Sequence, residues 1–451
     1  MKARWRVAVG LPVAVALGMV PGFGLGPGST DVSNSQARAP ARILEVYARS
    51  PVLVRAGEHV RLPVDVVCAT VQGDPCDATV TLATRSGGKG AWQMTTAEAV
   101  PGLRFDVSAP AARAAATGST GAVEFFVRAT GPGGRTSVLP AAGAASPLRF
   151  VVAKDIPVAR APIIPFGRVQ AGHTALALPW GSGPRRAGLA AGLDSATLGP
   201  SSFDVDARGR IYLADSLQDR LAVFAGGKLV RETPLPISAR ADIALTDRGA
   251  VFVLDQEASG PLVRRMDPNG RLGPGQHVGS GILGQVRTVG ETGLTALFPQ
   301  DVWSTVSATD QGALSATGST SGRPATGGHE FLRVVAGDSV RLATVAGGRV
   351  ADAIEVRFGQ RLGELALAEP DGVNGYWAVV HVRREQPPAD HYQVLHVSSG
   401  RVVQSFAVGD RRFADTPPLS RFRLGRDGLL YQLVTSPEGI RILRYGLGRE
   451  S

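Results

Sequence analysis

Three histidines in the C-terminal half of the chain recur at equal intervals. His277, His329 and His381 are each separated by 52 residues. Histidine is the commonest metal ligand and titrates near neutral pH, so equivalent positions in successive repeats would gather the three imidazoles into a metal or catalytic site. The alternative is that they are ordinary surface and core histidines, because His329 lies in a Gly-rich stretch and His381 in the apolar segment WAVVHVRR. We favour the alternative.

No other enzyme signature accompanies these histidines. The sequence contains no G-x-S-x-G nucleophile motif, no H-E-x-x-H zinc motif and no phosphate-binding glycine loop. We therefore predict no catalytic residue, no resident metal and no cofactor. The ligand-binding residues stay unknown at this stage.

The two cysteines of the chain form a second candidate pair. Cys68 and Cys76 stand in CATVQGDPC, with the turn residues Gly-Asp-Pro between them. A hairpin would bring the two side chains together, and an oxidising compartment would join them in a disulfide. A metal site is the weaker interpretation, because two thiolates supply only half of a structural zinc site.

The elements that would position such residues follow a repeat. Residues 199–230 alternate apolar and polar side chains over short segments separated by tight turns, and the pattern returns about forty residues later at 243–256 and again at 422–434. The positions that recur include Gly209, Asp215, Gly249, Asp255 and Gly428. A recurring all-β unit of about 40 residues is typical of a β-propeller blade.

The unit PSSFDVDARGRIYLADSLQDRLAVF resembles the NHL repeat. The matching residues are Asp206, Gly209, Tyr212, Asp215, Arg220 and Phe224. The resemblance implies a propeller in which Asp215 and Asp255 cap turns or pair across strands. Some NHL-type propellers are lyases that use histidines, acidic residues and a divalent metal around the central channel, so the resemblance also keeps the metal interpretation open.

The whole chain also resembles a group of exported proteins from high-GC bacteria. The segments that carry this likeness are DVVCA…DPC, LPAAGAASP and GRDGLLYQLVTSPEGIRILRY. The resemblance extends over nearly the full length. It implies export but no particular activity.

We predict an all-β protein with a β-sandwich followed by a six-bladed β-propeller. Glycine and proline are abundant, at 57 and 31 residues, which favours short strands and turns over helices. Residues 315–329 are expected to form a long loop, and the last segment, ILRYGLG, is expected to pair with the first blade and close the ring. The expected divisions are 1–26, a signal peptide or N-terminal anchor; 27–41, a linker; 42–154, an immunoglobulin-like β-sandwich; 155–180, a Pro-rich linker; and 181–451, an NHL-like propeller.

The N-terminus predicts export. MKARWR is basic, and an uncharged apolar run follows from Val7 to Val20, which is the layout of a signal peptide. The run is also close to the roughly 20 residues that span a membrane, so an uncleaved anchor is the alternative. Both interpretations place the rest of the chain outside the cytoplasm.

The positive charge gives little information on partners. The chain has a formal net charge of +10, but its basic residues occur singly or in pairs, with no run of five or more. We interpret the excess as solvated arginines, and nucleic acid is not expected as a partner. The sequence thus predicts a non-catalytic binding or scaffold protein for a protein, peptide or cell-envelope glycan, with a metal-dependent lyase or hydrolase at the central channel as the alternative.

Overall fold

The computed structural model is built from β-strands, and its described residues include the short 3-10 helices Gly143–Ala145 and Ser216–Gln218. The structure describes residues 43–48, 53–56, 58, 61–69, 78–86, 90–96, 98–100, 104–108, 121–131, 134–192, 195–257, 260–278, 285–297, 303–308, 314–320, 322–325, 329–371, 375–410, 413–414 and 421–446. In these residues no helix is long and apolar enough to cross a membrane. The expected signal peptide or anchor and the first linker lie outside them.

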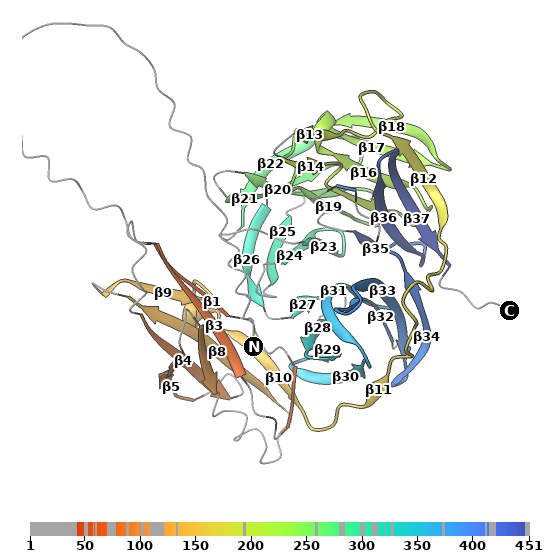
Figure 1. Ribbon diagram of the computed structural model, residues 1–451. Coiled ribbons are helices and arrows are strands. Elements are labelled where there is room, and N and C mark those ends of the chain that lie inside the picture. Colours follow the sequence, from red (N-terminus) through yellow and green to blue (C-terminus); the bar gives the residue numbers. More distant parts are fainter. Residues whose placement is uncertain are drawn as a thin grey trace, which may run out of the picture. The chain divides into compact units, whose positions relative to one another are not determined.

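Six antiparallel sheets, which we call blades 1 to 6, follow one another around a common axis (Figure 1). Blade 1 contains β15 (Ser202–Val205), β16 (Ile211–Asp215), β17 (Arg220–Ala225) and β18 (Lys228–Pro234); blade 2 contains β19 (Asp242–Leu245), β20 (Val251–Glu257), β21 (Gly260–Met266) and β22 (Leu272–His277); blade 3 contains β23 (Gln285–Val289), β24 (Gly293–Leu297), β25 (Trp303–Ala308) and β26 (Leu314–Thr320). The first strand of each blade lies at the axis: β15 lies beside β19, and β19 beside β23. The all-β fold and the six-bladed propeller predicted from the sequence are confirmed.

The second half of the ring repeats this order, and two of its three blades include a strand from earlier in the chain. Blade 4 contains β27 (Arg323–Pro324), β28 (His329–Ala336), β29 (Ser339–Ala346), β30 (Arg349–Arg357) and the earlier strand β11 (Val158–Arg160); blade 5 contains β31 (Arg361–Pro370), β32 (Gly375–Arg384), β33 (Ala389–Ser398) and β34 (Arg401–Val408); blade 6 contains β35 (Phe422–Leu424), β36 (Leu430–Ser436), β37 (Gly439–Tyr445) and the earlier strand β12 (His173–Pro179). A two-stranded sheet of β13 (Ala190–Gly192) and β14 (Ser195–Leu198) precedes blade 1.

The recurring glycines of the sequence occupy one turn position in three blades. Gly209, Gly249 and Gly428 have φ values of +70°, +83° and +79°, a left-handed conformation that residues with a Cβ rarely adopt. In blade 1 the preceding Asp206 caps the turn, because its Oδ1 accepts hydrogen bonds from the backbone nitrogens of Arg208 and Arg210, each at 2.9 Å. The repeat in the sequence is therefore a repeat of turn geometry between the first two strands of a blade.

The ring closes through a strand that the sequence analysis treated as linker. β12 pairs antiparallel with β37, from His173 opposite Arg444 to Pro179 opposite Gly439. The partner of the last segment is thus a strand that precedes blade 1, and not blade 1 itself. Residues 155–180 are more than a Pro-rich linker, since they supply both β11 and β12. Likewise, the expected loop 315–329 contains most of β26 and all of β27.

Two further sheets precede the propeller. One contains β1 (Ile43–Ala48), β3 (Arg61–Ala69), β7 (Arg104–Ser108) and β6 (Glu98–Val100); the other contains β2 (Leu53–Arg55), β10 (Leu148–Ala153), β8 (Ala122–Thr130), β4 (Thr79–Ser86), β5 (Gln93–Thr96) and β9 (Thr136–Leu139). Val46 and Val64 of the first sheet belong to the same hydrophobic cluster as Val80, Phe125 and Phe150 of the second. The immunoglobulin-like topology stays a prediction. The pairing of Cys68 with Cys76 also stays one, since Cys76 lies outside the described residues.

The N-terminal sheets and blade 4 share a second cluster. Leu53, Val151 and Ala153 are buried together with Leu332 and Ala343. A charged network lies beside this cluster: the Arg341 guanidinium is 2.7 Å from a Glu58 carboxylate oxygen and 2.9 Å from Glu355. Apolar burial supplies most of the stabilisation of such a contact, at about 25 cal/mol per Å², while the ion pairs fix the geometry of its polar border.

Candidate functional site

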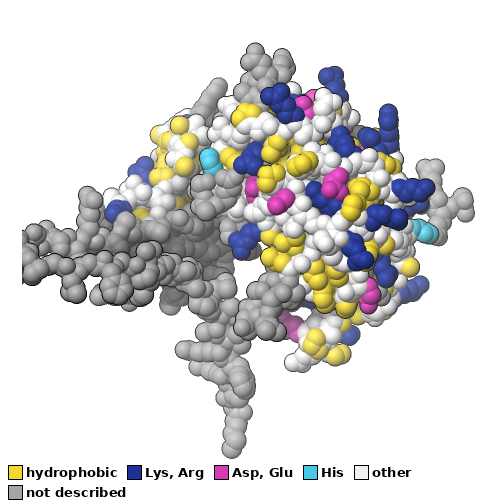
Figure 2. All heavy atoms as spheres, turned by 90° about the horizontal axis from the view of Figure 1, so that it is seen from above, with side chains coloured by type: hydrophobic (Ala, Val, Ile, Leu, Met, Phe, Trp, Pro, Cys, Tyr) yellow, Lys and Arg dark blue, Asp and Glu magenta, His cyan; other side chains and the backbone are white. Residues whose placement is uncertain are grey.

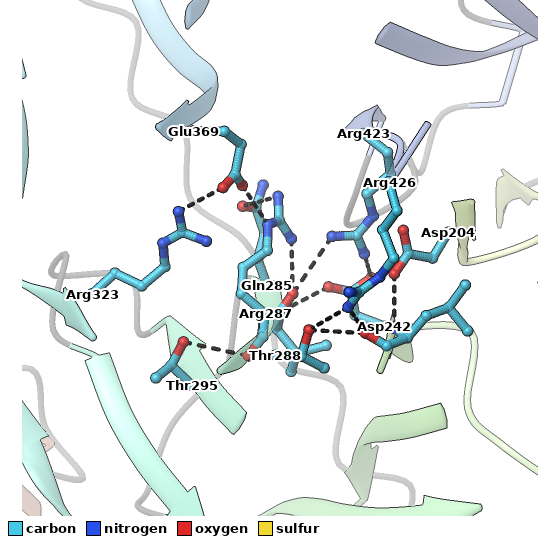
Figure 3. Close-up of polar contacts among 12 residues, drawn as sticks. Asp204, Asp242, Gln285, Arg287, Thr288, Thr295, Arg323, Glu369, Arg423 and Arg426 are labelled. Atoms are coloured by element: carbon cyan, nitrogen blue, oxygen red, sulfur yellow. Dashed lines mark hydrogen bonds and ion pairs between the residues drawn. The ribbon is translucent and has the colours of Figure 1, made fainter. Parts of the chain in front are cut away.

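The axis of the propeller carries charged side chains from the first strands of the blades. Arg423 and Asp242 are almost completely buried, with 3% and 0% of their surface exposed. Figure 3 shows how Asp242, Arg287, Arg323, Glu369 and Arg423 converge at this place. Buried charges are stable only when they are paired and hydrogen-bonded, so the partners of each group decide what the site is able to do.

Arg423 joins blade 6 to blades 1 and 2. Its Nη2 lies 2.6 Å from Asp242 Oδ1 and donates to the backbone oxygen of Ile243 at 2.8 Å, while its Nε donates to the backbone oxygen of Phe203 at 2.9 Å. The second carboxylate oxygen of Asp242 accepts a hydrogen bond from the backbone nitrogen of Val286 in blade 3 at 2.8 Å. One ion pair thus connects four blades.

Glu369 joins the other half of the ring. Its Oε1 accepts from Arg287 Nε of blade 3 at 2.8 Å, and its Oε2 lies 2.5 Å from Arg323 Nη2 of blade 4. Because Glu369 belongs to blade 5, this triad connects blades 3, 4 and 5. Together with Arg423 and Asp242 it links all six blades through side chains at the axis.

The pKa shifts of these groups agree with a paired, water-poor site. Burial alone would raise the pKa of Glu369, but Arg323 and Arg287 outweigh burial and hold the pKa of this carboxyl at about 2. Burial, followed by the like charge of Arg287, lowers the pKa of Arg423 from its ordinary value. Arginine stays protonated in proteins, and Glu369 stays ionised. Neither group titrates near neutral pH.

A hollow of about 260 Å³ opens over this network. Its walls include Asp204, Arg287, Arg323, Glu369 and Arg426. Arg426 is already engaged: its guanidinium donates to Thr288 Oγ1 at 2.9 Å and to the backbone oxygen of Leu245, and it pairs with Asp247. The hollow is therefore a shallow polar entrance whose arginines mostly serve neighbouring blades.

No family model and no curated protein sequence matches the chain. Among solved structures, Kuenenia stuttgartiensis hydrazine synthase is similar over 54% of this chain and 76% of its own, at 12% identity and a TM-score of 0.38. Virginiamycin B lyase from Staphylococcus aureus covers 59% of this chain and 89% of its own, at 10% identity and a TM-score of 0.32. A streptogramin B lyase covers 73% and 90%, at 10% identity and a TM-score of 0.30. At these TM-scores the likeness carries no argument about the site, and the blade count rests on the sheet topology.

The three equally spaced histidines do not meet at the axis. His277 is exposed at the end of β22, the fourth strand of blade 2. His329 is exposed at the start of β28, whereas His381 lies near the end of β32, and both strands are second in their blades. The equal interval of 52 residues is therefore not an equivalence of position.

His381 instead lies with two carboxylates of blade 5. One ligand atom from each of His381, Asp390 and Asp410 fits within 4.8 Å of the others, a donor set of one nitrogen and two oxygens. However, Arg421 Nη1 is 3.1 Å from Asp410 Oδ1, and His381 Nε2 is 3.2 Å from Asp390 Oδ2, half of whose side chain is exposed. Each of the three side chains is thus engaged in ion pairing or hydrogen bonding.

The acidic residues of the repeat make backbone and cross-strand contacts. Asp215 is fully buried, accepts from the backbone nitrogen of Gly188 at 3.2 Å and pairs with Arg220 Nη2 at 3.2 Å. Asp255 accepts from the backbone nitrogen of Ser238 at 2.9 Å. Each carboxylate therefore binds the backbone of the segment that precedes the first strand of its own blade.

The axis residues were not predicted from the sequence, although a signal for five of them exists. Asp204 stands between Phe203 and Val205, and Arg423 stands between Phe422 and Leu424, which is the same place in two repeats. A charged residue at this place in the first strand of a blade lies at the axis of the ring. Arg287, Arg323 and Glu369 stand at this place as well, since each of the five charged residues pairs with the residue eight positions later on the next strand. Asp242 stands two residues before the equivalent position, which Ala244 occupies in blade 2.

Proposed function

We propose that the protein is an exported, non-catalytic binding or scaffold protein, whose closed propeller displays its surface to a protein, peptide or cell-envelope glycan. The observation that carries the proposal is the occupied axis. General acid–base catalysis needs groups whose pKa lies near the working pH. The groups described at this axis are guanidinium ions, the Glu369 carboxyl with a pKa of about 2, and two aspartates. Asp242 is paired with Arg423, and Asp204 accepts a hydrogen bond from the backbone nitrogen of Leu245.

The axis network also supports a mechanical role. Links among all six blades, added to the strand pairing of β12 with β37, make the ring a rigid frame on which surface loops keep a fixed geometry. Preorganised surfaces bind with less loss of conformational entropy. The junction between blade 4 and the N-terminal sheets extends this frame toward the N-terminus, where the signal or anchor is predicted.

The test is co-sedimentation of the purified protein with cell envelopes of the producing organism, with and without EDTA, together with metal analysis of the same protein. We expect saturable binding that EDTA does not change and less than a tenth of an equivalent of any divalent metal. Stoichiometric zinc, calcium or magnesium with a fall of several degrees in Tm after chelation would overturn the proposal in favour of the metal-dependent enzyme, and His381→Ala would then identify the ligand set.

A further inference from the structure

Two adjoining hollows lie along β12 where blade 6 meets blade 1. Their volumes are about 550 Å³ and 740 Å³, and they share Ala177, Phe224 and Gly227. Consecutive residues of β12, from Thr174 to Pro179, form one wall of both. We call the pair of hollows the β12 groove.

The β12 groove is bordered by cations. Arg185 and Arg186 line one hollow, Arg208 and Arg444 line the other, and all four side chains are exposed. Asp427 is the one carboxylate among the described lining residues, and it already accepts from the Tyr431 hydroxyl at 2.7 Å. Figure 2 views the molecule from above Figure 1, where β18 lies, and shows Lys and Arg spread over this face with fewer acidic side chains between them. The border is positively charged.

The cations at one end of the groove are held in place. The segment that carries Arg185 and Arg186 is fixed by Trp180, whose Nε1 donates to the backbone oxygen of Ser436 at 2.8 Å. Gln218 Nε2 donates to the backbone oxygen of Arg186 at 3.0 Å, and Asp215 accepts from the backbone nitrogen of Gly188. The Arg186 guanidinium itself donates to the backbone oxygen of Trp180 at 2.9 Å. A ligand at this end therefore meets one charge that is already positioned, which lowers the entropic cost of binding.

β12 also presents a strand edge to the groove. It is the outermost strand of its sheet, and its described backbone makes one hydrogen bond besides those to β37, from Ala187 N to Pro179 O at 3.0 Å. Its side chain Ala177 is small and exposed, whereas Ala175 lies partly buried at a β-bulge between Thr174 and Leu176. A Cβ added at Gly227 would lie 3.9 Å from the Ala175 oxygen. An unpaired edge with room beside it accepts an extended peptide through main-chain hydrogen bonds.

We propose that the β12 groove binds an extended acidic peptide, which adds as a strand to the edge of β12 while its carboxylates pair with arginines at both ends. The inference rests on the proposed binding function and gives it a site and a ligand chemistry. An anionic glycan or polyphosphate would satisfy the cations, but it would leave the peptide groups of β12 unpaired. The edge is the reason to favour a peptide.

The experiment measures fluorescence anisotropy with a labelled ten-residue peptide of alternating glutamate and valine, capped at both ends. Two competitors separate the contributions: the same peptide with two alternate valines replaced by proline, which cannot complete a strand ladder, and polyphosphate of matched charge. We expect saturable binding of the glutamate–valine peptide that weakens as salt rises, with the proline peptide and polyphosphate competing at least tenfold less well.

Matched variants locate the site. R208E/R444E is expected to raise the Kd of the peptide at least tenfold, whereas R349E/R401E, which reverses two exposed arginines of blades 4 and 5, leaves it within twofold. Gly226 and Gly227 both have positive φ, at +54° and +76°, but a Cβ at Gly226 meets nothing within 4 Å. Gly227→Asn is therefore expected to weaken binding by obstructing the edge, and Gly226→Asn serves as its control.

Two results would overturn the inference. The proline peptide and polyphosphate could compete as well as the unlabelled glutamate–valine peptide, or R349E/R401E could weaken peptide binding as much as R208E/R444E does. In either case the protein would recognise charge alone. Envelope co-sedimentation of the same variants separates the two proposals. If envelopes bind R208E/R444E as well as wild type and no peptide binds, the β12 groove is wrong and the binding function stands. If the peptide binds as expected and wild type does not sediment with envelopes, the groove stands and the envelope role is wrong.

Discussion

Arg423 Nη2 lies 2.6 Å from Asp242 Oδ1, and this ion pair connects the last blade to the second across the axis. The two residues are 181 positions apart in the chain. The ring is thus closed twice, by strand pairing of β12 with β37 at its outer side and by a charge pair at its centre. The inner closure explains why a guanidinium with only 3% of its surface exposed is stable there.

Removal of Arg423 is predicted to destabilise the protein strongly. Arg423→Met leaves Asp242 buried without its cation, and breaking a buried pair from one side costs about 3–5 kcal/mol. Urea denaturation measures the change in the free energy of unfolding. Arg401→Met, at an exposed arginine of β34, is the control and should change it by less than about 0.5 kcal/mol.

The double variant R423M/D242N tests whether the two residues act as a pair. Once Asp242 is neutralised, loss of the Arg423 cation leaves no unpaired buried charge. The double variant is therefore expected to lose about 0.5–3 kcal/mol less free energy of unfolding than the sum of the losses in the two single variants. Additive losses would show that Arg423 acts through its bonds to backbone oxygens and not through Asp242.

The architecture was predictable because a blade is a local unit. Gly209 and Gly249 recur forty residues apart since each blade needs one left-handed turn between its first two strands, and such turns leave a trace in any single sequence. Strands β12 and β27 left no such trace. β12 finds its partner some 260 residues later, and β27 has two residues in a stretch whose composition is typical of a loop.

The axis network leaves a weaker trace in the sequence. Five of its charged residues recur at one register position in their blades, but the sign of the charge changes from blade to blade and Asp242 lies outside this position. Which residues pair is therefore decided by three-dimensional closure. Glu369 stands in LALAEP, an ordinary strand end in sequence, and Arg287 in QVRTV. The three histidines show the opposite situation, because their regular interval of 52 residues in sequence has no equivalent position in the blades.

Glu369→Gln is predicted to remove stability in a defined pH range. The folded pKa of about 2 lies below the ordinary value of 4.5, so the carboxylate stabilises the fold above pH 4.5 and this contribution is lost as pH falls toward 2. At about 1.4 kcal/mol per pKa unit, the difference between wild type and variant should approach about 3 kcal/mol at pH 7 and vanish near pH 2.

Urea denaturation at intervals between pH 2.5 and 7 measures this convergence. Glu385→Gln is the matched control, because that side chain is 68% exposed although it also pairs with an arginine. A gap between wild type and E369Q that stays constant across the range would mean that the substitution acts through packing and not through charge.

His391 is predicted to make the fold sensitive to mild acid. Its side chain is fully buried, and neither ring nitrogen has a hydrogen-bond partner among the residues that the structure describes. Burial lowers its pKa below 6.5, against the opposing effect of Asp390. The unfolded chain therefore takes up a proton at a higher pH than the folded chain, and stability that is present above pH 6.5 declines as pH falls through the folded pKa.

His391→Leu should remove this decline. An apolar side chain leaves no polar atom unpaired, so the variant is expected to be as stable as wild type at pH 8 and more stable at pH 5. Thermal melts at the two pH values measure the difference. His173→Leu, at an exposed histidine of β12, controls for general effects of losing an imidazole. If Tm falls by the same amount between pH 8 and pH 5 in wild type and in H391L, His391 is not the source of the acid sensitivity.

The predicted disulfide between Cys68 and Cys76 provides a test of export. In an oxidising compartment the bond would form and, for a loop of this size, contribute about 2–3 kcal/mol by the loop-entropy estimate. Protein recovered from its own cells without reductant is expected to have an intact mass lower by two hydrogens than the reduced chain. The variant C68A/C76A should unfold at lower urea and, unlike wild type, be insensitive to dithiothreitol. Two free thiols in freshly recovered protein would contradict both the bond and an oxidising location, since a pair brought together by a hairpin oxidises readily wherever the environment permits it.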